Sequence, residues 1–178
     1  MKIFIVRHGQ TDFNAEGRNQ FPTTPLNSNG MAQAQTAADK IAKLKIEHFY
    51  ASDFMRARQT AEIINKKLNL PIIFDKRLRE KHNGDVAGKV QKEIPDIMND
   101  YYKNPHKYNA ESFEDVFVRV KNFFDELKKS GKNNVLLVTH SHTMNTMLYY
   151  FTGKQWNYEK FLNGMVHVKN GEVLEFDI

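Results

Sequence analysis

Short apolar runs alternate with amphipathic stretches along this chain. Residues 3–6 and 135–138 are continuous apolar runs, which is typical of strands that are buried on both faces. Residues 49–51 and 71–74 predict two further strands. In the intervening stretches apolar residues recur every three or four positions, which predicts helices over 28–44, 54–68, 113–127 and 143–151 and a shorter helix near 90–102.

The alternation of strands and helices predicts an α/β fold, a three-layer α/β/α sandwich with a mostly parallel central sheet. Residues 165–168 and 173–176, separated by the turn residues 169–172, predict a closing antiparallel hairpin. Residues 81–110 are irregular and predict a short insertion over the sheet. We therefore expect residues 1–178 to form a single domain.

A long polar segment, residues 9–29, follows the first strand. A connection of this length without periodicity is usually functional. Asn27 or Ser28 is expected to cap the helix that follows it, and Ser52 or Asp53 to cap the next helix.

The composition is that of an ordinary folded domain. Of the 178 residues, 40% are hydrophobic and 26% are charged, which excludes the composition of a disordered chain. The absence of cysteine excludes disulfides, thiolate metal sites and cysteine nucleophiles. The N-terminal apolar stretch ends at Arg7, too soon for a signal peptide, and no apolar run is long enough to span a membrane. We therefore expect a cytoplasmic protein without a membrane partner.

The charge is basic, with 26 lysines and arginines against 21 acidic residues and a net charge of +5. Such an excess indicates either an anionic partner or merely a solvated surface. Lysines within 40–45 and 128–132 could contact nucleic-acid phosphates, which keeps a non-enzymatic nucleic-acid-binding module as an alternative. These lysines lie on separate predicted helices without a groove-binding motif, so we expect no nucleic-acid partner.

Histidines follow two of the predicted strands. His8 comes directly after the first strand and Arg7, and His140 comes after the fourth. Ligands of open α/β sheets bind beyond the carboxyl ends of the strands, so both histidines are candidates for one site. A single histidine in such a place is usually structural, whereas two of them beside an arginine indicate chemistry. His140 and His142 could also share one face of a strand and bind a metal, an alternative that we consider minor.

These strand ends carry a family resemblance. Residues 7–14 (RHGQTDFN) resemble the signature Arg-His-Gly-Glu/Gln-Ser/Thr-x-x-Asn of the histidine phosphatase superfamily, the phosphoglycerate mutase-like proteins. Residues 52–61 (SDFMRARQTA) resemble its second arginine motif, residues 78–80 (LRE) its acid motif, and residues 138–140 (VTH) its second histidine motif. Because the matches occur in order over nearly the whole chain, the resemblance also implies a phosphoglycerate mutase-like fold.

The resemblance implies a role for each of five catalytic residues. His8 is the nucleophile that forms a covalent phosphohistidine, with a backbone carbonyl in the following loop holding its other ring nitrogen. Arg7 and Arg56 bind the phosphoryl oxygens, together with a cationic His140. Glu80 is the general acid that protonates the leaving oxygen. Because these side chains supply the charge, we expect no metal and no cofactor.

The residues alone leave two of these roles open. Arg56 could equally be a solvated helix arginine like Arg58. Glu80 could be a surface glutamate paired with a neighbouring cation, Arg77, Arg79 or Lys81.

Further residues are candidates for substrate binding. We expect contacts to phosphate or substrate from Asn14, Gln20, Phe21 and Ser141. Aromatic residues at the mouth of the site could include Phe21, Tyr101, Tyr102 and Tyr108. The chain departs from the family pattern at Ser141, where glycine is usual, and at residues 86–87, where Trp-Glu is usual.

The leading hypothesis is a phosphatase that acts on a small phosphorylated metabolite. The main alternative is a phosphoglycerate mutase, which would use the same residues and return the phosphoryl group to the product. We expect hydrolysis because the chain is short and its insertion is brief, which leaves the phosphoenzyme open to water. A branch acting on phosphohistidine or phosphorylated proteins is a further alternative.

Overall fold

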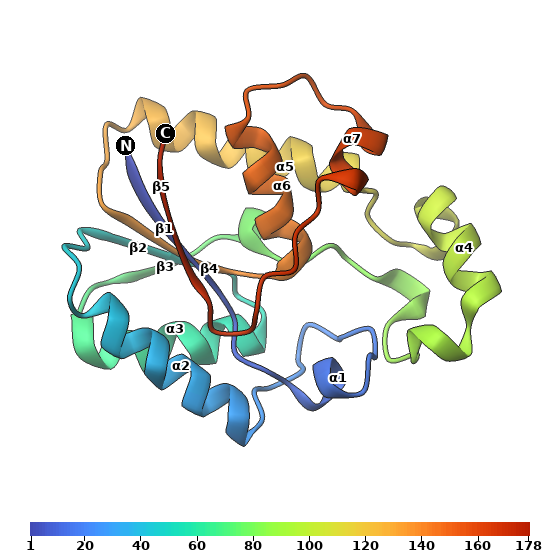
Figure 1. Cartoon of the computed structure of the whole chain (residues 1–178), viewed down its shortest axis with the longest axis horizontal. Helices are drawn as coiled ribbons and strands as arrows, with labels where there is room; N and C mark the ends of the chain where they lie inside the picture. Colours follow the sequence, from blue (N-terminus) through green and yellow to red (C-terminus); the bar gives the residue numbers. More distant parts are fainter.

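A central five-stranded sheet organises the molecule (Figure 1). A computed structural model describes residues 1–178. The strands lie in the order β3-β2-β4-β1-β5. Their bounds are β1 Lys2–Arg7, β2 His48–Ala51, β3 Ile72–Phe74, β4 Val135–Thr139 and β5 Val173–Asp177. All pairs are parallel except β1 with β5, so the sheet is mostly parallel, as the sequence predicted.

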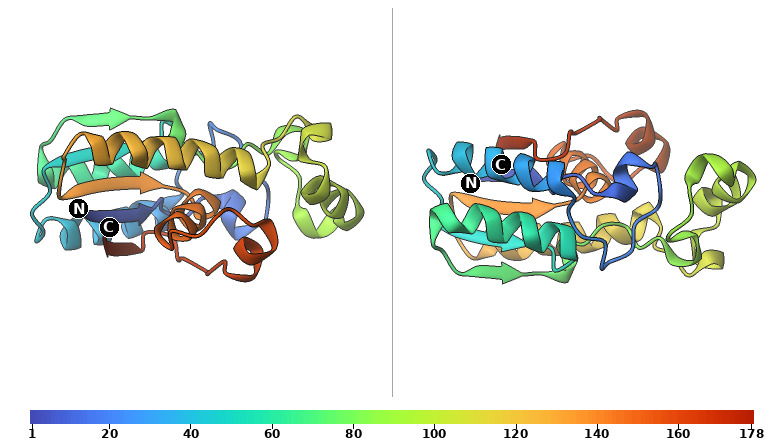
Figure 2. Two further views of the ribbon diagram at one scale, coloured as in Figure 1. Left: turned by 90° about the horizontal axis from the view of Figure 1, so that it is seen from above. Right: turned by 90° about the horizontal axis from the view of Figure 1, so that it is seen from below.

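Helices cover both faces of the sheet. Apolar side chains of α5 (Phe113–Lys129) and α6 (Ser141–Phe151) pack on one face with Ile3 and Ile5. Those of α2 (Ser28–Ile41) and α3 (Met55–Leu68) pack on the other face with Phe4 and Val6. Figure 2 shows the two helix pairs from opposite sides of the sheet. The predicted three-layer α/β/α sandwich is therefore confirmed.

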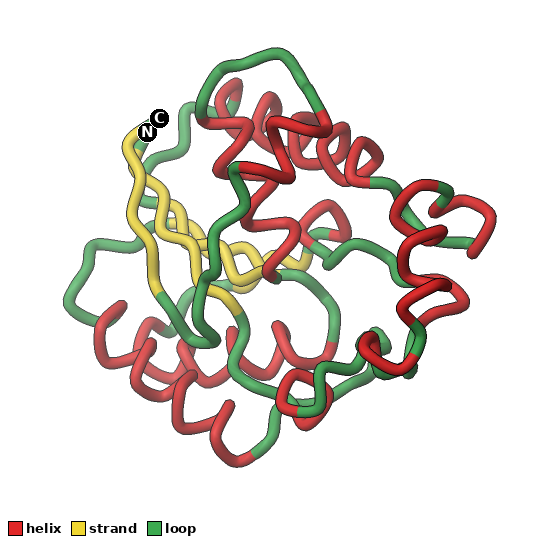
Figure 3. The backbone as a smooth tube through the Cα atoms, turned by 45° about the vertical axis from the view of Figure 1, so that its right-hand side comes forward, coloured by secondary structure: helices red, strands yellow, loops and turns green.

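The insertion forms a small unit beside the sheet, where Figure 3 shows its helices standing apart from the strands. It contains α4 (Pro95–Lys103) and the short 3-10 helices η2 (Gly84–Val86), η3 (Gln91–Glu93) and η4 (Pro105–Tyr108). Its own core consists of Val86, Met98, Tyr101 and Ala110.

The remaining short helices are α1 (Asp12–Ala15), η1 (Lys76–Leu78) and α7 (Tyr158–Asn163). No helix of the chain is both long and apolar enough to cross a bilayer.

The predicted closing hairpin is wrong. Residues 165–168 form no strand, and β5 pairs antiparallel with β1 instead. The reason is that side chains form hydrogen bonds with the backbone groups that a second strand would have to pair. Asn145 accepts the Val166 N–H at 2.7 Å and donates to the Val166 carbonyl at 3.1 Å, while Arg7 donates to the Val168 carbonyl.

Helix capping follows the prediction once and departs from it once. Asn27 caps α2, with its side chain accepting the Gly30 N–H at 2.8 Å. Helix α3 has Phe54 at its N-cap and no side-chain cap, so neither Ser52 nor Asp53 caps it. Asp53 is paired with Arg79 instead.

Candidate active site

The parallel pairing of β1 with β4 brings the two histidines together. Arg7 is in register with Thr139, so the next residue of each strand, His8 and His140, leaves the sheet at the same edge. Their ring centroids are 5.0 Å apart and both rings are buried. The site therefore lies at the carboxyl ends of two parallel strands, where α/β sheets bind ligands.

Two contacts orient the His8 imidazole. Nδ1 donates to the Gly9 carbonyl oxygen at 2.7 Å, which confirms the expected backbone acceptor. Nε2 accepts the Nε–H of Arg56 at 3.2 Å, so this nitrogen carries the lone pair. Burial, Arg56 and Arg7 hold the pKa of His8 well below its ordinary value. The ring is consequently neutral, with Nε2 in the form that can attack phosphorus.

Two glycines allow the loop after β1 to take this position. A Cβ atom at Gly9 would lie 2.2 Å from the Gly30 carbonyl oxygen at the start of α2. A Cβ at Gly30 would lie 2.0 Å from the Gln10 carbonyl oxygen. The Gly9 N–H also donates to Thr60 Oγ1 on α3 at 3.1 Å. The loop is therefore fixed between two helices by contacts that only glycine permits.

Arg7 and Arg56 are buried cations without a carboxylate partner. Arg56 is 1% exposed and donates through Nη1 to the Phe21 carbonyl at 3.0 Å, so it is not a solvated arginine. Burial lowers the pKa of Arg56 to about 10, which leaves it charged at neutral pH. Nε of Arg7 is buried without a hydrogen-bond partner. Two unpaired guanidinium groups next to His8 favour the binding of an anion there.

His140 is neutral in this environment, contrary to the expected cation. Burial and the nearby Arg56 cation hold its pKa well below the ordinary value, because a dry surrounding and an adjacent positive charge both disfavour a further charge. Its Nε2 lies 2.8 Å from Ser52 Oγ, and its Nδ1 is buried without a partner. Ser52 therefore orients the ring and leaves one nitrogen unused.

Glu80 is not a surface glutamate paired with a neighbouring cation. It follows η1 and accepts the backbone N–H groups of Lys81 at 2.9 Å, His142 at 3.3 Å and Thr143 at 3.3 Å. Its carboxylate also lies 3.6 Å from His142 Nδ1. Burial would raise its pKa, but His142 and His140 and these hydrogen bonds hold the pKa well below the ordinary value. The carboxylate is therefore ionised in the structure.

The cations that sequence analysis offered as partners for Glu80 are engaged elsewhere. Arg77 pairs with Asp75 and Glu126. Lys81 is buried and donates to the Tyr101 hydroxyl.

These groups open into a cavity of about 270 Å³. Of the expected site residues, its lining includes Arg7, His8, Asn14, Gln20, Arg56, Glu80 and Ser141. His140 lies fully buried behind it. The Phe21 ring is not among the lining residues, because it packs edge-on against Phe13 and over Gly88, and only its carbonyl reaches Arg56. Of the aromatic residues expected at the mouth, only Tyr102 lines the cavity.

One wall of the cavity was not predicted from the sequence. This wall includes Arg18, Asn19, Asn83, Gln91 and His142. Backbone bonds join residues 17–19 to residues 88–91, including Asn19 N–H to the Lys89 carbonyl at 3.0 Å and Gln91 N–H to the Gly17 carbonyl at 3.1 Å. No local sequence pattern predicts this pairing across 70 residues. His142, two residues after His140, was considered only as a possible metal ligand and not as part of the cavity wall. No three His, Asp or Glu side chains gather into a metal site.

Comparisons with known proteins identify the family. Residues 3–177 match the model of the histidine phosphatase superfamily, branch 1. The chain therefore belongs to the histidine phosphatase superfamily.

Individual relatives include both phosphatases and a mutase-like protein. Phosphoglycerate mutase-like protein 4 of Arabidopsis thaliana is 32% identical over 94% of this chain and 78% of its own length. Phosphoserine phosphatase 1 of Hydrogenobacter thermophilus is 30% identical over 83% of this chain and 74% of its own. A mycobacterial glucosyl-3-phosphoglycerate phosphatase, solved in complex with VO3, superimposes with a TM-score of 0.84 at 26% identity, covering 98% of this chain and 90% of that one.

Proposed function

We propose that this protein is a phosphatase that hydrolyses a small phosphomonoester through a covalent phosphohistidine on His8. One observation carries the proposal. The His8 imidazole is neutral and buried, its Nδ1 proton is held by the Gly9 carbonyl, and its Nε2 lone pair lies beside the unpaired cations Arg7 and Arg56. This arrangement suits a nucleophile for an anionic phosphoryl group.

In the first step, His8 Nε2 attacks the phosphorus atom. The new N–P bond forms as the bond from phosphorus to the ester oxygen breaks, and Arg7 and Arg56 hold the equatorial oxygens. The unpartnered Nδ1 of His140 is available to another of these oxygens. Arg56 must then exchange its contact with Nε2 for a phosphoryl oxygen.

Glu80 supplies the proton for the ester oxygen. Its carboxylate is ionised in the structure, and a phosphate group beside it would raise its pKa and favour protonation. A phosphomonoester that enters as its monoanion brings the required proton. In the second step, water attacks phosphorus, Glu80 takes the water proton, the N–P bond breaks and phosphate leaves.

Two observations support hydrolysis of a small polar substrate. The cavity of about 270 Å³ has a lining dominated by polar side chains. At its rim Tyr102 is 37% exposed and the Arg18 side chain is 34% exposed, so water has access from outside. Relatives named as phosphoserine and glucosyl-3-phosphoglycerate phosphatases are consistent with this choice.

The test compares phosphate release with phosphoryl transfer. Initial rates are measured on phosphoserine, 3-phosphoglycerate, glycerol 2-phosphate, a sugar phosphate and p-nitrophenyl phosphate, for the native chain and for His8→Ala. We expect phosphate release that His8→Ala abolishes. The control Arg58→Gln, which changes a half-buried arginine outside the cavity, should retain it. Formation of 2-phosphoglycerate from 3-phosphoglycerate faster than phosphate release would instead establish the mutase.

A further inference from the structure

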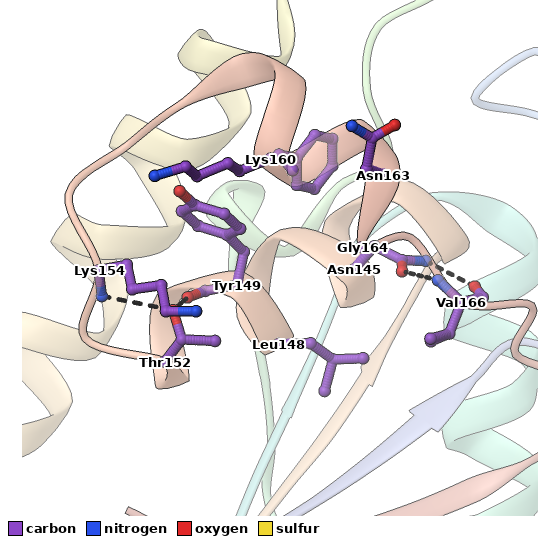
Figure 4. Close-up of a pocket in the computed structure, with 10 residues that line it drawn as sticks. Asn145, Leu148, Tyr149, Thr152, Lys154, Lys160, Asn163, Gly164 and Val166 are labelled. Atoms are coloured by element: carbon purple, nitrogen blue, oxygen red, sulfur yellow. Dashed lines mark hydrogen bonds between the residues drawn. The ribbon is translucent and has the colours of Figure 1, made fainter.

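A second cavity, of about 520 Å³, lies between α6 and α7 (Figure 4). None of its lining residues lines the cavity that holds His8. Its apolar surface comes from Leu148, Tyr149, Phe161 and Val166. Val166 is 50% exposed, although it is a large apolar residue in a segment without regular structure. The cavity is large enough for a molecule with one or two rings.

The charge of this cavity is positive and uncompensated. Lys154 and Lys160 line it, no carboxylate does, and neither lysine forms an ion pair or donates a side-chain hydrogen bond. Figure 4 shows both lysines on the Tyr149 side of the cavity, opposite Val166. The Tyr149 hydroxyl is already bonded to the Gln155 carbonyl at 2.9 Å. The free polar groups are thus the two exposed lysines and the Asn163 amide, next to an apolar surface, a combination that complements an organic anion.

One wall of the cavity is connected to the catalytic residues. Asn145 lines the cavity, and its amide nitrogen donates to the carbonyls of Ser141 at 3.0 Å and Val166 at 3.1 Å. The chain then continues to Val168, whose carbonyl accepts from Arg7. It continues to residues 170–171, where the Asn170 side chain donates to the His8 carbonyl at 2.9 Å and the Gly171 N–H to the Arg7 carbonyl at 3.0 Å.

We propose that the cavity between α6 and α7 binds a small organic anion with an apolar ring body, and that its occupancy changes the anion affinity of the catalytic site. The acidic group lies between Lys154 and Lys160, and the ring body packs on Leu148, Phe161 and Val166. A ligand that displaces Val166 or Asn145 moves the carbonyl that holds Arg7. The binding of the two anions is therefore coupled, and coupling of this kind is reciprocal.

The binding test uses two fluorescent probes of similar shape. The sulfonate 8-anilinonaphthalene-1-sulfonate is titrated with saturating inorganic phosphate present, which occupies Arg7 and Arg56, and N-phenyl-1-naphthylamine serves as its uncharged analogue. We expect saturable binding of the sulfonate that Lys154→Gln/Lys160→Gln weakens at least about tenfold. The control Lys40→Gln/Lys43→Gln removes the same charge from α2 and the residues after it, and should bind as the native chain does. Equal affinity in the two double variants, or no saturable binding, would overturn the site.

The coupling test does not require catalysis, so it stands apart from the proposed function. The affinity for inorganic phosphate is measured by calorimetry with and without saturating sulfonate probe. We expect a change of at least about fivefold in the native chain, the lower end of typical coupling. In Asn145→Ala, which cuts the connection at Ser141 and Val166, the change should disappear when the probe is present at a concentration that saturates that variant. An unchanged phosphate affinity in the native chain, or an undiminished change in Asn145→Ala, would refute the coupling.

Discussion

At the scale of single residues, protonation is set by partners that lie far away in the sequence. His8 obtains a defined tautomer from its neighbour Gly9 and from Arg56, 48 residues later. Glu80 obtains its low pKa from the first turn of α6, more than 60 residues later. The sequence could predict which residue types serve phosphoryl transfer. It could not predict that Glu80 is ionised or that His140 is neutral, because both states depend on burial and on contacts across the fold.

Glu80→Gln separates the two chemical steps. Nitrophenolate leaves without a proton, so the first step should survive with p-nitrophenyl phosphate, while water attack loses its base. We expect steady-state turnover to fall by about 10²- to 10⁴-fold and a burst of nitrophenol to precede it. Stopped-flow absorbance measures both. A variant that turns over at the native rate would remove Glu80 from the second step. A variant that loses the burst together with turnover would show that the first step needs Glu80 even when the leaving group takes no proton.

At the scale of elements, the buried strands were the most predictable feature. Residues 3–6 and 135–138 are apolar on both faces. Both faces of such a strand are buried when the strand lies between two layers of helices. The register of β1 and β4 then placed His8 beside His140. The segment 165–168 was not predictable, because side chains of Asn145 and Arg7, rather than local propensity, decide the path of the chain there. Helix α7 was not predicted either, although Asn157 caps it locally.

The insertion contains a buried lysine that should limit stability. Lys81 is 3% exposed, and burial lowers its pKa to about 8, below its value of about 10.4 in an unfolded chain. Between these values the unfolded state binds more protons, so the contribution of Lys81 to stability rises with pH. Lys81→Met should remove this rise and stabilise the protein at pH 7, by up to about 3 kcal/mol.

Denaturant unfolding at pH 7 and pH 9.5 measures this difference for Lys81→Met and for Lys66→Met, an exposed lysine on α3. The native chain and Lys66→Met should respond to pH alike, and Lys81→Met should gain less stability at the higher pH. The same pH response in all three proteins would show that Lys81 is not a buried cation.

At the scale of the whole molecule, part of the positive charge is concentrated at one cavity. A net charge of +5 by itself did not distinguish an anionic partner from a solvated surface. The structure places Arg7 and Arg56 without counter-ions around one small cavity. An anion that binds there compensates two buried charges and should stabilise the entire fold.

This linkage predicts a rise in melting temperature with phosphate or vanadate. Phosphate at 100 times its dissociation constant should add about 2.7 kcal/mol to the free energy of unfolding. Thermal shift assays with the native chain, Arg56→Gln and the control Arg58→Gln measure the effect; Arg58 is half-buried over the Phe74 ring and lies outside the cavity. We expect the rise in the native chain and in Arg58→Gln, and a much smaller one in Arg56→Gln. A similar rise in all three would place the anion elsewhere.

If the phosphoryl group passes through His8, a covalent phosphohistidine forms there during turnover and can be trapped. The native chain and Glu80→Gln are mixed with ³²P-labelled p-nitrophenyl phosphate, quenched in alkali, which preserves phosphohistidine, and digested for mass spectrometry. We expect up to about one label per chain, attached to His8, with more label in Glu80→Gln and none in His8→Ala. Label on another residue, or full phosphate release by His8→Ala, would contradict it.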